Sequence, residues 1–335
     1  MRIAVLGAGA WGTALALRLS LRHTVTLWTR SSEHAQQIRS TAANERYLRG
    51  FPVPDTITVT ADLAAAVAAA ELVLVVVPSS GFRATLEALA ALSPAALIWA
   101  CKGLEPGTTL LPHQVVEEVF GDRIACGVLS GPTFAEEVAR GLPTAITLAS
   151  RDAAFAREAA HTLHDKTLRI YNSDDVIGVE IGGAVKNVMA IAAGISDGMG
   201  FGNNARAALI TRGLAEMARL SQALGGGFDT IMGLAGAGDL ILTCTGDMSR
   251  NRRVGLALAA GKPLAEIIAS LGHTAEGVHT ALELTRLIEQ HQVDMPVTSA
   301  VCAVLHDNLD PKRAVEMLLA REPKPEYLAR SSLAL

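Results

Sequence analysis

One lysine of this chain is surrounded by glycine and alanine at helical spacing, and it is the residue best placed for chemistry. Lys186 lies in the segment 174–194, where it shares a predicted helix face with Gly183, Ala190 and Gly194. Because the other residues of that face are small, the ammonium group is predicted to project into a cavity that holds a cofactor or substrate. The alternative is close helix packing, with a lysine that extends to solvent at the edge of the contact.

Three glycines near the beginning of the chain match a dinucleotide-binding fingerprint. Gly7, Gly9 and Gly12 follow a short apolar run and precede a helical segment. Gly7 would allow a tight turn, Gly9 would let the backbone approach a pyrophosphate, and Gly12 would permit close packing of helix and strand. The pyrophosphate would then lie at the helix N-terminus. The alternative is a glycine-rich turn that serves packing alone.

The end of the second predicted strand indicates which dinucleotide is bound. Residues 28–32 contain no carboxylate to hold a ribose 2′-hydroxyl, and Arg30 stands there instead. A guanidinium can pair with a 2′-phosphate. NADP(H) is therefore favoured, or at least accepted, unless Arg30 is only a solvated charge in a loop.

Two further predicted strands end in residues suited to bind an oxygen anion. Lys102 follows the predicted strand 95–100, and Ser130 and Thr133 lie in a turn after the predicted strand 124–128. Ligands of doubly wound sheets bind at the carboxyl ends of strands, next to helix N-termini. The alternatives are a solvated lysine and two hydroxyls that only cap a helix.

Two segments of the second half also carry charges that could contact a ligand. Residues 233–239 are predicted to form a flexible glycine-rich loop that ends in the carboxylate of Asp239. Ser249 precedes a helix start with three arginines, at positions 250, 252 and 253, which together make a candidate phosphate site. A cluster of solvated charges is the alternative.

Alternating strands and helices must position these residues in the first half of the chain. The predicted strands are 3–6, 24–28, 72–77, 95–100, 124–128 and 145–148, with weaker edge candidates at 57–60 and 168–171. The predicted helices between them are 15–22, 63–70, 82–92 and 152–163. Short aliphatic strands that take turns with helices are typical of a parallel, doubly wound α/β sheet.

The second half of the chain is predicted to be helical throughout. Its expected helices are 174–194, 205–224, 252–260, 264–271, 278–291 and 296–307. We therefore expect a Rossmann-like domain over residues 1–172, followed by an all-α domain over residues 173–335. No Pro- or Ser-rich spacer separates them, so the two domains should pack closely across a cleft.

Composition and charge exclude several classes of protein. The chain has 335 residues, which at about 150 residues per domain corresponds to two domains. Its 29 basic and 33 acidic residues give a net charge of −4, which argues against a nucleic-acid partner. The four cysteines form no CxxC pair, so no metal site is expected, and they fit a reduced cytoplasmic location.

The sequence also predicts no membrane-spanning segment. No uncharged apolar stretch reaches about 18 residues, so no stable membrane insertion is expected. Residues 1–17 could be read as a secretory signal, but three glycines interrupt the apolar region. The strand and glycine turn described above explain that stretch better.

Several of these segments, in this order, resemble the bacterial biosynthetic type of NAD(P)-dependent glycerol-3-phosphate dehydrogenase. They are residues 101–103, 130–135, 183–190, 195–198, 203–206, 238–240, 249–252 and 275–277, and the resemblance covers nearly the whole chain. It implies a C-terminal domain like that of 6-phosphogluconate dehydrogenase. It also implies interconversion of dihydroxyacetone phosphate and sn-glycerol 3-phosphate in the cytoplasm, leading to glycerophospholipids. The resemblance is compatible with a homodimer.

The same resemblance implies roles for individual residues. Lys186 would be the catalytic acid and base, and the substrate would contact Lys102, Gly131, Thr133, Lys186, Asp239, Ser249, Arg250 and Asn251. NAD(P)H would contact Ala10, Trp11, Arg30, Lys102, Ala135, Arg250 and Glu276, with Tyr47 and Thr274 as further neighbours. Ala10 replaces the serine that is common in the family, so only its backbone N–H is expected to bind there.

Two other functions fit parts of the sequence. A β-hydroxyacid dehydrogenase has a similar fold and lysine-bearing helix, but it would need to recognise a carboxylate. A dinucleotide-sensing regulator without turnover would bind the cofactor, but it leaves the face around Lys186 unexplained.

Overall fold

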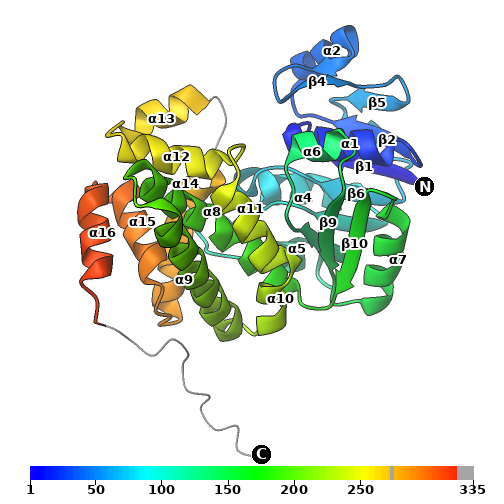
Figure 1. Ribbon diagram of the computed structural model, residues 1–335. Helices are drawn as coiled ribbons and strands as arrows, with labels where there is room; N and C mark the ends of the chain where they lie inside the picture. Colours follow the sequence, from blue (N-terminus) through cyan, green and yellow to red (C-terminus); the bar gives the residue numbers. More distant parts are fainter. Residues whose placement is uncertain (272–274, 323–335) are drawn as a thin grey trace, which may run out of the picture.

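The chain forms one large sheet followed by a group of helices, and the computed structural model describes residues 1–271 and 275–322 (Figure 1). The strands of the sheet are β1 (Arg2–Leu6), β2 (Thr24–Trp28), β5 (Ile57–Thr60), β6 (Leu72–Val75), β7 (Ala96–Trp99), β8 (Ala125–Ser130), β9 (Thr144–Ala149) and β10 (Leu168–Ser173). Their order across the sheet is β10-β9-β8-β7-β6-β1-β2-β5. All eight overlap the strands that were predicted, including the two weaker edge candidates.

One pairing of the sheet contradicts the predicted parallel arrangement. β8 and β9 are antiparallel, with Val128 opposite Ala149 and Ser130 opposite Thr147, whereas the other neighbouring strands are parallel. The segment 131–143 returns from the same edge at which β8 ends, so it makes no crossover to the opposite edge. The sheet is therefore predominantly but not wholly parallel.

Helices cover both faces of the sheet, and its central strands are buried on both sides as predicted. They are α1 (Ala10–Leu19), α2 (Ser32–Thr41), α3 (Leu63–Val67), the 3-10 turn η1 (Ser79–Gly81), α4 (Phe82–Ala90), α5 (Pro112–Phe120), α6 (Ala135–Ala139) and α7 (Ala153–Leu163). Along β1, Ile3 and Val5 face one apolar core, while Ala4 and Leu6 face the other. The sequence analysis placed a helix N-terminus at α6 but missed α2 and α5, together with the hairpin of β3 (Ala43–Asn44) and β4 (Leu48–Pro52).

The start of the chain lies inside this sheet. β1, which belongs to the stretch considered as a secretory signal, pairs with β2 on one side and β6 on the other. α1 begins at Ala10, five residues earlier than predicted, because Gly9 already serves as its N-cap residue. The glycine turn therefore connects a central strand directly to a buried helix.

After Ser173 the described residues contain helices and no strand, as predicted (Figure 1). The helices are α8 (Val176–Gly198), α9 (Gly202–Ala223), α10 (Phe228–Met232), α11 (Asp239–Thr245), α12 (Arg250–Ala259), α13 (Leu264–Leu271), α14 (Glu276–Gln290), α15 (Pro296–His306) and α16 (Pro311–Leu319). A π-helical segment, η2 (Leu234–Gly238), joins α10 to α11.

The long helix α8 is the core of the helical half. It packs against α9, α11, α12 and α14, and also against strand β8 of the sheet. A Cβ atom on Gly194 would lie 2.0 Å from the carbonyl oxygen of Arg252, so α8 and α12 meet backbone to backbone at this point. Within residues 1–271 and 275–322, α8 alone is long and apolar enough to cross a membrane, and 89% of its apolar window is buried inside the protein. That burial is typical of a core helix.

Candidate functional site

The glycine turn after β1 has the geometry that a bound pyrophosphate needs. Gly7 has a φ of +118°, and a Cβ there would lie 2.4 Å from the carbonyl oxygen of Val76. A Cβ on Gly12 would lie 1.9 Å from the carbonyl oxygen of Gly7, so only glycine fits at either position. Nothing lies within 4 Å of the Cβ position of Gly9. The N-terminus of α1 is thus open to an anion at this point.

The residues predicted to contact the adenosine end lie beyond β2. Arg30 is exposed, and none of the residues that the structure describes forms an ion pair with it. Ser31 caps α2 by accepting a hydrogen bond from the backbone N–H of His34 at 3.1 Å. The ring of Tyr47 is partly buried and lies edge-on to the His34 ring, with centroids 5.2 Å apart.

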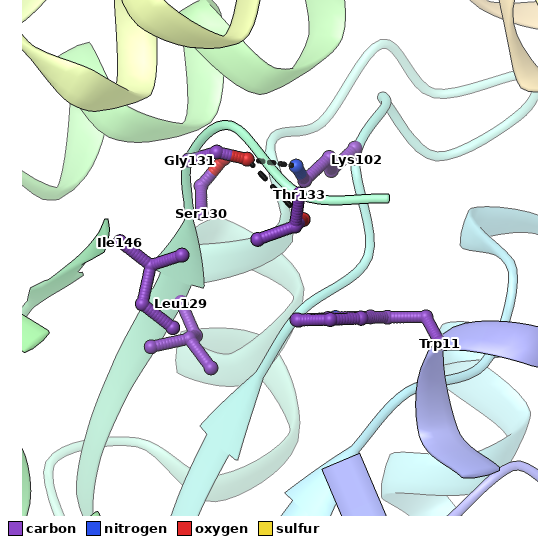
Figure 2. Close-up of a pocket in the computed structure, with 7 residues that line it drawn as sticks. All are labelled: Trp11, Lys102, Leu129, Ser130, Gly131, Thr133 and Ile146. Atoms are coloured by element: carbon purple, nitrogen blue, oxygen red, sulfur yellow. Dashed lines mark hydrogen bonds between the residues drawn. The ribbon is translucent and has the colours of Figure 1, made fainter. Parts of the chain in front are cut away.

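A pocket opens between the glycine turn and the end of β8. Its lining residues are Trp11, Lys102, Leu129, Ser130, Gly131, Thr133 and Ile146 (Figure 2). The predicted cofactor residues Ala10, Trp11 and Ala135 belong to one small apolar cluster, where the first turn of α1 meets α6. Neither Ser130 nor Thr133 caps α6, because the N-cap residue is Phe134 and no side chain caps this helix. The capping alternative is therefore wrong for both hydroxyls.

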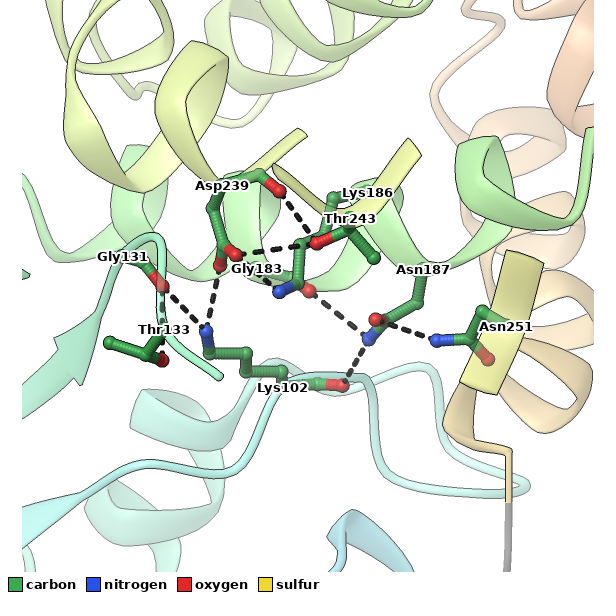
Figure 3. A network of polar contacts seen from close by, with 9 residues as sticks. All are labelled: Lys102, Gly131, Thr133, Gly183, Lys186, Asn187, Asp239, Thr243 and Asn251. Atoms are coloured by element: carbon green, nitrogen blue, oxygen red, sulfur yellow. Dashed lines mark hydrogen bonds and ion pairs between the residues drawn. The ribbon is translucent and has the colours of Figure 1, made fainter. Parts of the chain in front are cut away.

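Two lysines share one buried carboxylate at the junction of the sheet and the helices (Figure 3). Asp239 is fully buried, and its Oδ2 accepts a hydrogen bond from Lys102 Nζ at 2.7 Å. Its Oδ1 accepts from Lys186 Nζ in a short contact. Lys102 Nζ also donates to the carbonyl oxygen of Gly131 at 3.1 Å. We name Lys102, Asp239 and Lys186 the lysine–aspartate cluster.

Burial changes the ionisation of the lysine–aspartate cluster. The pKa of Lys186 falls to about 8, mainly because burial disfavours its ammonium form. The positive charge of Lys102 acts in the same direction, whereas the negative charge of Asp239 opposes it. Burial also raises the pKa of Glu276 at the start of α14. The positive charges of Arg250, Lys102 and Lys186 oppose this rise. An amine with a pKa of about 8 can both donate and accept a proton near neutral pH.

The segment 233–239 is not the flexible loop that was predicted. It is the π-helical segment η2, which continues directly into α11. A Cβ on Gly236 would lie 2.0 Å from the carbonyl oxygen of Ile231, and one on Gly182 would lie 2.3 Å from that of Ala235. These glycines let the π-helical segment pack closely against α8, and that contact places Asp239 beside Lys186.

The small-residue face of α8 divides into two parts. A Cβ on Gly183 would lie 3.4 Å from Cγ of Lys102 and 3.1 Å from Oγ of Ser130, so Gly183 makes room for the cluster. Gly194 instead packs against the backbone of α12, as the packing alternative predicted. Lys186 does not reach solvent, because only 6% of the residue is exposed. Its ammonium contacts Asp239 instead.

Asparagines fix the helices around the cluster. Asn187 Nδ2 donates to the carbonyl oxygens of Lys102 and Gly183, each at 3.2 Å. Asn251 Nδ2 donates to Asn187 Oδ1 at 2.9 Å, and Asn251 Oδ1 accepts from the backbone N–H of Gly277 at 3.1 Å. These bonds connect α8, α12 and α14 next to Lys102.

The three arginines at the start of α12 do not act as one group. Arg252 pairs with Asp197 at 2.7 Å and with Asp247 at 2.9 Å, so its guanidinium already has two protein partners. Arg250 and Arg253 are exposed. Ser249 caps α12 by accepting from the backbone N–H of Arg252 at 3.2 Å. The predicted phosphate site is thereby reduced to Arg250 and the N-terminus of α12.

The structure adds one polar group that the sequence analysis missed. Thr243 Oγ1 donates to the carbonyl oxygen of Asp239 at 2.6 Å and lies 3.4 Å from its Oδ1. The signal was a threonine four residues after the aspartate, visible only once 239–245 is known to be helical. Thr274, predicted to neighbour the cofactor, lies outside the described residues.

The described residues contain no group of three or more His, Cys, Asp or Glu side chains placed to hold a metal ion. Together, the glycine turn, the pocket beside it and the buried lysine–aspartate cluster define a dinucleotide-dependent dehydrogenase with a Rossmann-like domain and a helical domain.

The chain belongs to the NAD-dependent glycerol-3-phosphate dehydrogenase family. The family model for the N-terminal part matches residues 2–156, and the model for the C-terminal part matches residues 175–316. A relative from Aromatoleum aromaticum, named glycerol-3-phosphate dehydrogenase [NAD(P)+], is 62% identical over 97% of this chain and 100% of its own length. One of the same name from Nitrosospira multiformis is 59% identical over 97% of this chain and 99% of its own.

Solved structures agree with this assignment. The crystal structure of glycerol-3-phosphate dehydrogenase from Coxiella burnetii has a TM-score of 0.92 and 44% identity, covering 96% of this chain and 99% of that one. D-mandelate dehydrogenase in complex with NADH is only 18% identical, with a TM-score of 0.61 over 92% of this chain and 98% of its own. That second likeness shows a shared fold alone.

Proposed function

We propose that this chain reduces dihydroxyacetone phosphate to sn-glycerol 3-phosphate with NAD(P)H, for glycerophospholipid synthesis in the cytoplasm. The observation that carries the proposal is the buried lysine–aspartate cluster, which adjoins the pocket lined by Trp11 and Thr133. Residues 1–172 would bind the dinucleotide, and residues 173–335 would supply Lys186 and Asp239. The proposal needs no metal ion, nucleic acid or membrane partner, and it is compatible with a homodimer.

Lys186 would protonate the carbonyl oxygen of the substrate. When bound, the reduced nicotinamide supplies the hydride. The ammonium of Lys186 then donates a proton to the oxygen on which negative charge develops, and Asp239 orients it through their hydrogen bond. Once Lys186 is neutral, the ammonium of Lys102 still balances the charge of Asp239. The cluster can therefore lose a proton without leaving a buried carboxylate unpaired.

Lys102 would bind the substrate as well as support Asp239. Its ammonium has three donors, and two of them go to Asp239 and the carbonyl oxygen of Gly131. The third donor is available for a substrate oxygen, next to the Thr133 hydroxyl. The substrate phosphate would lie at the start of α12, held by Arg250 and by the first backbone N–H groups of that helix. Ser249 and Asn251 flank this position.

The activity can be tested by following NADPH absorbance with and without dihydroxyacetone phosphate. The proposal predicts NADPH oxidation only when this substrate is present. A β-hydroxyacid dehydrogenase would instead turn over a β-hydroxyacid, and a regulator would bind NADPH without oxidising it. Faster turnover of a β-hydroxyacid, or binding without any turnover, would contradict the proposal.

We expect Arg30→Asp to weaken NADPH binding much more than NADH binding. The exposed guanidinium after β2 would pair with the 2′-phosphate, which a carboxylate repels, whereas a carboxylate can accept a hydrogen bond from a 2′-hydroxyl. Fluorescence titration with each cofactor measures both dissociation constants. Equal losses for NADPH and NADH would show that Arg30 does not distinguish the 2′ position.

We expect Arg250→Ala to raise the KM for dihydroxyacetone phosphate roughly tenfold or more. A hydrogen bond to a charged group contributes about 1.5–3 kcal/mol, and about 1.4 kcal/mol corresponds to a factor of ten. Steady-state kinetics at saturating NADPH measure this constant. Arg253→Ala is the matched control, because Arg253 is an exposed arginine on the same turn. An unchanged KM in Arg250→Ala would remove the start of α12 from the phosphate site.

A further inference from the structure

A buried polar network connects the glycine turn to the end of β2. Its centre is Asn44 in β3, which is 0% exposed. Asn44 Nδ2 donates to the carbonyl oxygen of Ala8 at 2.9 Å and to Oγ1 of Thr13 at 2.8 Å. Asn44 Oδ1 lies 3.1 Å from Nε2 of His34, and Nδ1 of His34 lies 3.2 Å from Oγ1 of Thr29.

The chemistry of these groups fixes the orientation of the Asn44 amide. The carbonyl of Ala8 can only accept, so the amide of Asn44 must turn its NH₂ group toward it. Asn44 Oδ1 then faces His34 and accepts from Nε2–H. Because the Thr29 hydroxyl can both donate and accept, it can pair with Nδ1 of the His34 ring. Every link has a matching donor and acceptor, and such satisfied buried networks favour a single geometry.

The two ends of the network lie at the two places where a dinucleotide would bind. Ala8 stands between Gly7 and Gly9 in the glycine turn, and Thr29 immediately precedes Arg30. Asn44 and His34 are themselves buried, with 0% and 7% exposed, so they are shielded from a ligand in the pocket. They can influence binding only through the backbone that they hold.

We propose that Asn44 and His34 are positioning residues for the dinucleotide. Asn44 holds the glycine turn in the conformation that binds the pyrophosphate. His34 holds the end of β2 in the position that contacts the 2′ group of the adenosine ribose. Without these bonds, both segments would have to be ordered when the cofactor binds, and that cost would appear as lost affinity. The inference rests on the proposed function for the identity of the ligand, but it concerns binding and not proton transfer.

Fluorescence titrations with NADPH and NADH test the inference on the full chain. Asn44→Ala is expected to raise the dissociation constants of both cofactors about tenfold, as for the loss of two or three buried hydrogen bonds. Thr29→Val, which keeps the side-chain shape, should weaken NADPH more than NADH, because it loosens only the end of β2. Gln37→Ala is the matched control, since Gln37 bonds the same hairpin from its partly exposed side, at the carbonyl oxygen of Ala43.

A positioning role and a merely structural role differ in what else changes. Positioning predicts that folded Asn44→Ala keeps its turnover at saturating NADPH and loses only cofactor affinity. A structural role predicts a lower melting temperature with both dissociation constants within about twofold of those of the original chain, and that result would overturn the inference.

If Asn44→Ala fails to fold, the titrations of Thr29→Val test the positioning role instead. An unchanged ratio of NADPH to NADH affinity in that variant would overturn the inference. The proposed function is tested separately, because these titrations need no substrate. A chain that binds NADPH but leaves dihydroxyacetone phosphate unreduced contradicts the proposed function, while the variant titrations still decide the role of Asn44.

Discussion

Replacing Lys186 with methionine is expected to lower turnover about 10²–10⁴-fold, the usual contribution of one general acid or base. Methionine keeps most of the length of the lysine stem and removes the ammonium that would protonate the substrate oxygen. The variant should fold, because Lys186 lies in the middle of the long core helix α8, where an unbranched apolar side chain is accommodated. It should also bind NADPH normally, since the glycine turn and Arg30 are untouched. Turnover at saturating substrate, with NADPH titration alongside, measures both effects.

Lys102→Met is the matched comparison. Lys102 contacts the same carboxylate but also lines the pocket, so its loss should raise the KM for dihydroxyacetone phosphate more than it lowers turnover. If Lys186 served only to pack the helices, methionine would fill its place and turnover would survive. A Lys186→Met enzyme that keeps about half of its turnover, far above the range for a lost general acid, would contradict the mechanism.

The strands were predictable because their signal is local. β2 and β5 occupy the predicted residues 24–28 and 57–60, where threonines alternate with buried apolar residues, a pattern typical of a half-buried strand. The direction of β9 was not predictable in this way. Parallel and antiparallel strands buried on both faces have the same apolar pattern, and only the path of the segment 131–143 sets the direction.

The candidate site was predicted in its members but not in its contacts. Lys102, Lys186 and Asp239 were each identified from the sequence, 137 residues apart at the extremes, yet nothing local predicts that one carboxylate bonds both lysines. The prediction of a flexible loop at 233–239 was wrong for a related reason. Glycines usually indicate flexibility, whereas here Gly236 is required by a backbone contact with Ile231 that only the fold creates.

The arginine cluster and the hairpin show the same limit. Arg252 belonged to the predicted arginine cluster, but it forms an ion pair with Asp197, at the far end of α8. Asn44 and His34 were not singled out at all, because a buried Asn and a buried His look like ordinary polar residues until their partners Ala8 and Thr29 are known. Side chains that act through other residues leave little trace in sequence spacing.

The efficiency of carbonyl reduction is expected to fall about tenfold for each pH unit above the pKa of Lys186, because only the ammonium form donates a proton. That pKa is about 8, lowered from its usual value by burial. Oxidation of sn-glycerol 3-phosphate needs the neutral amine as a base, so its efficiency should fall below the same pH. Asp239→Asn removes a charge that raises the pKa of Lys186, so the inflection should move to lower pH.

The pH dependence of kcat/KM, measured in both directions on one preparation, tests the role of Lys186 most directly, because this quantity reports groups of the free enzyme. The account predicts opposite profiles that share one inflection at a pH of about 8, which moves down in Asp239→Asn. Two results would contradict the assignment of Lys186 as the proton donor. One is kcat/KM that falls on the same side of the inflection for reduction and for oxidation. The other is an inflection that keeps its pH in Asp239→Asn.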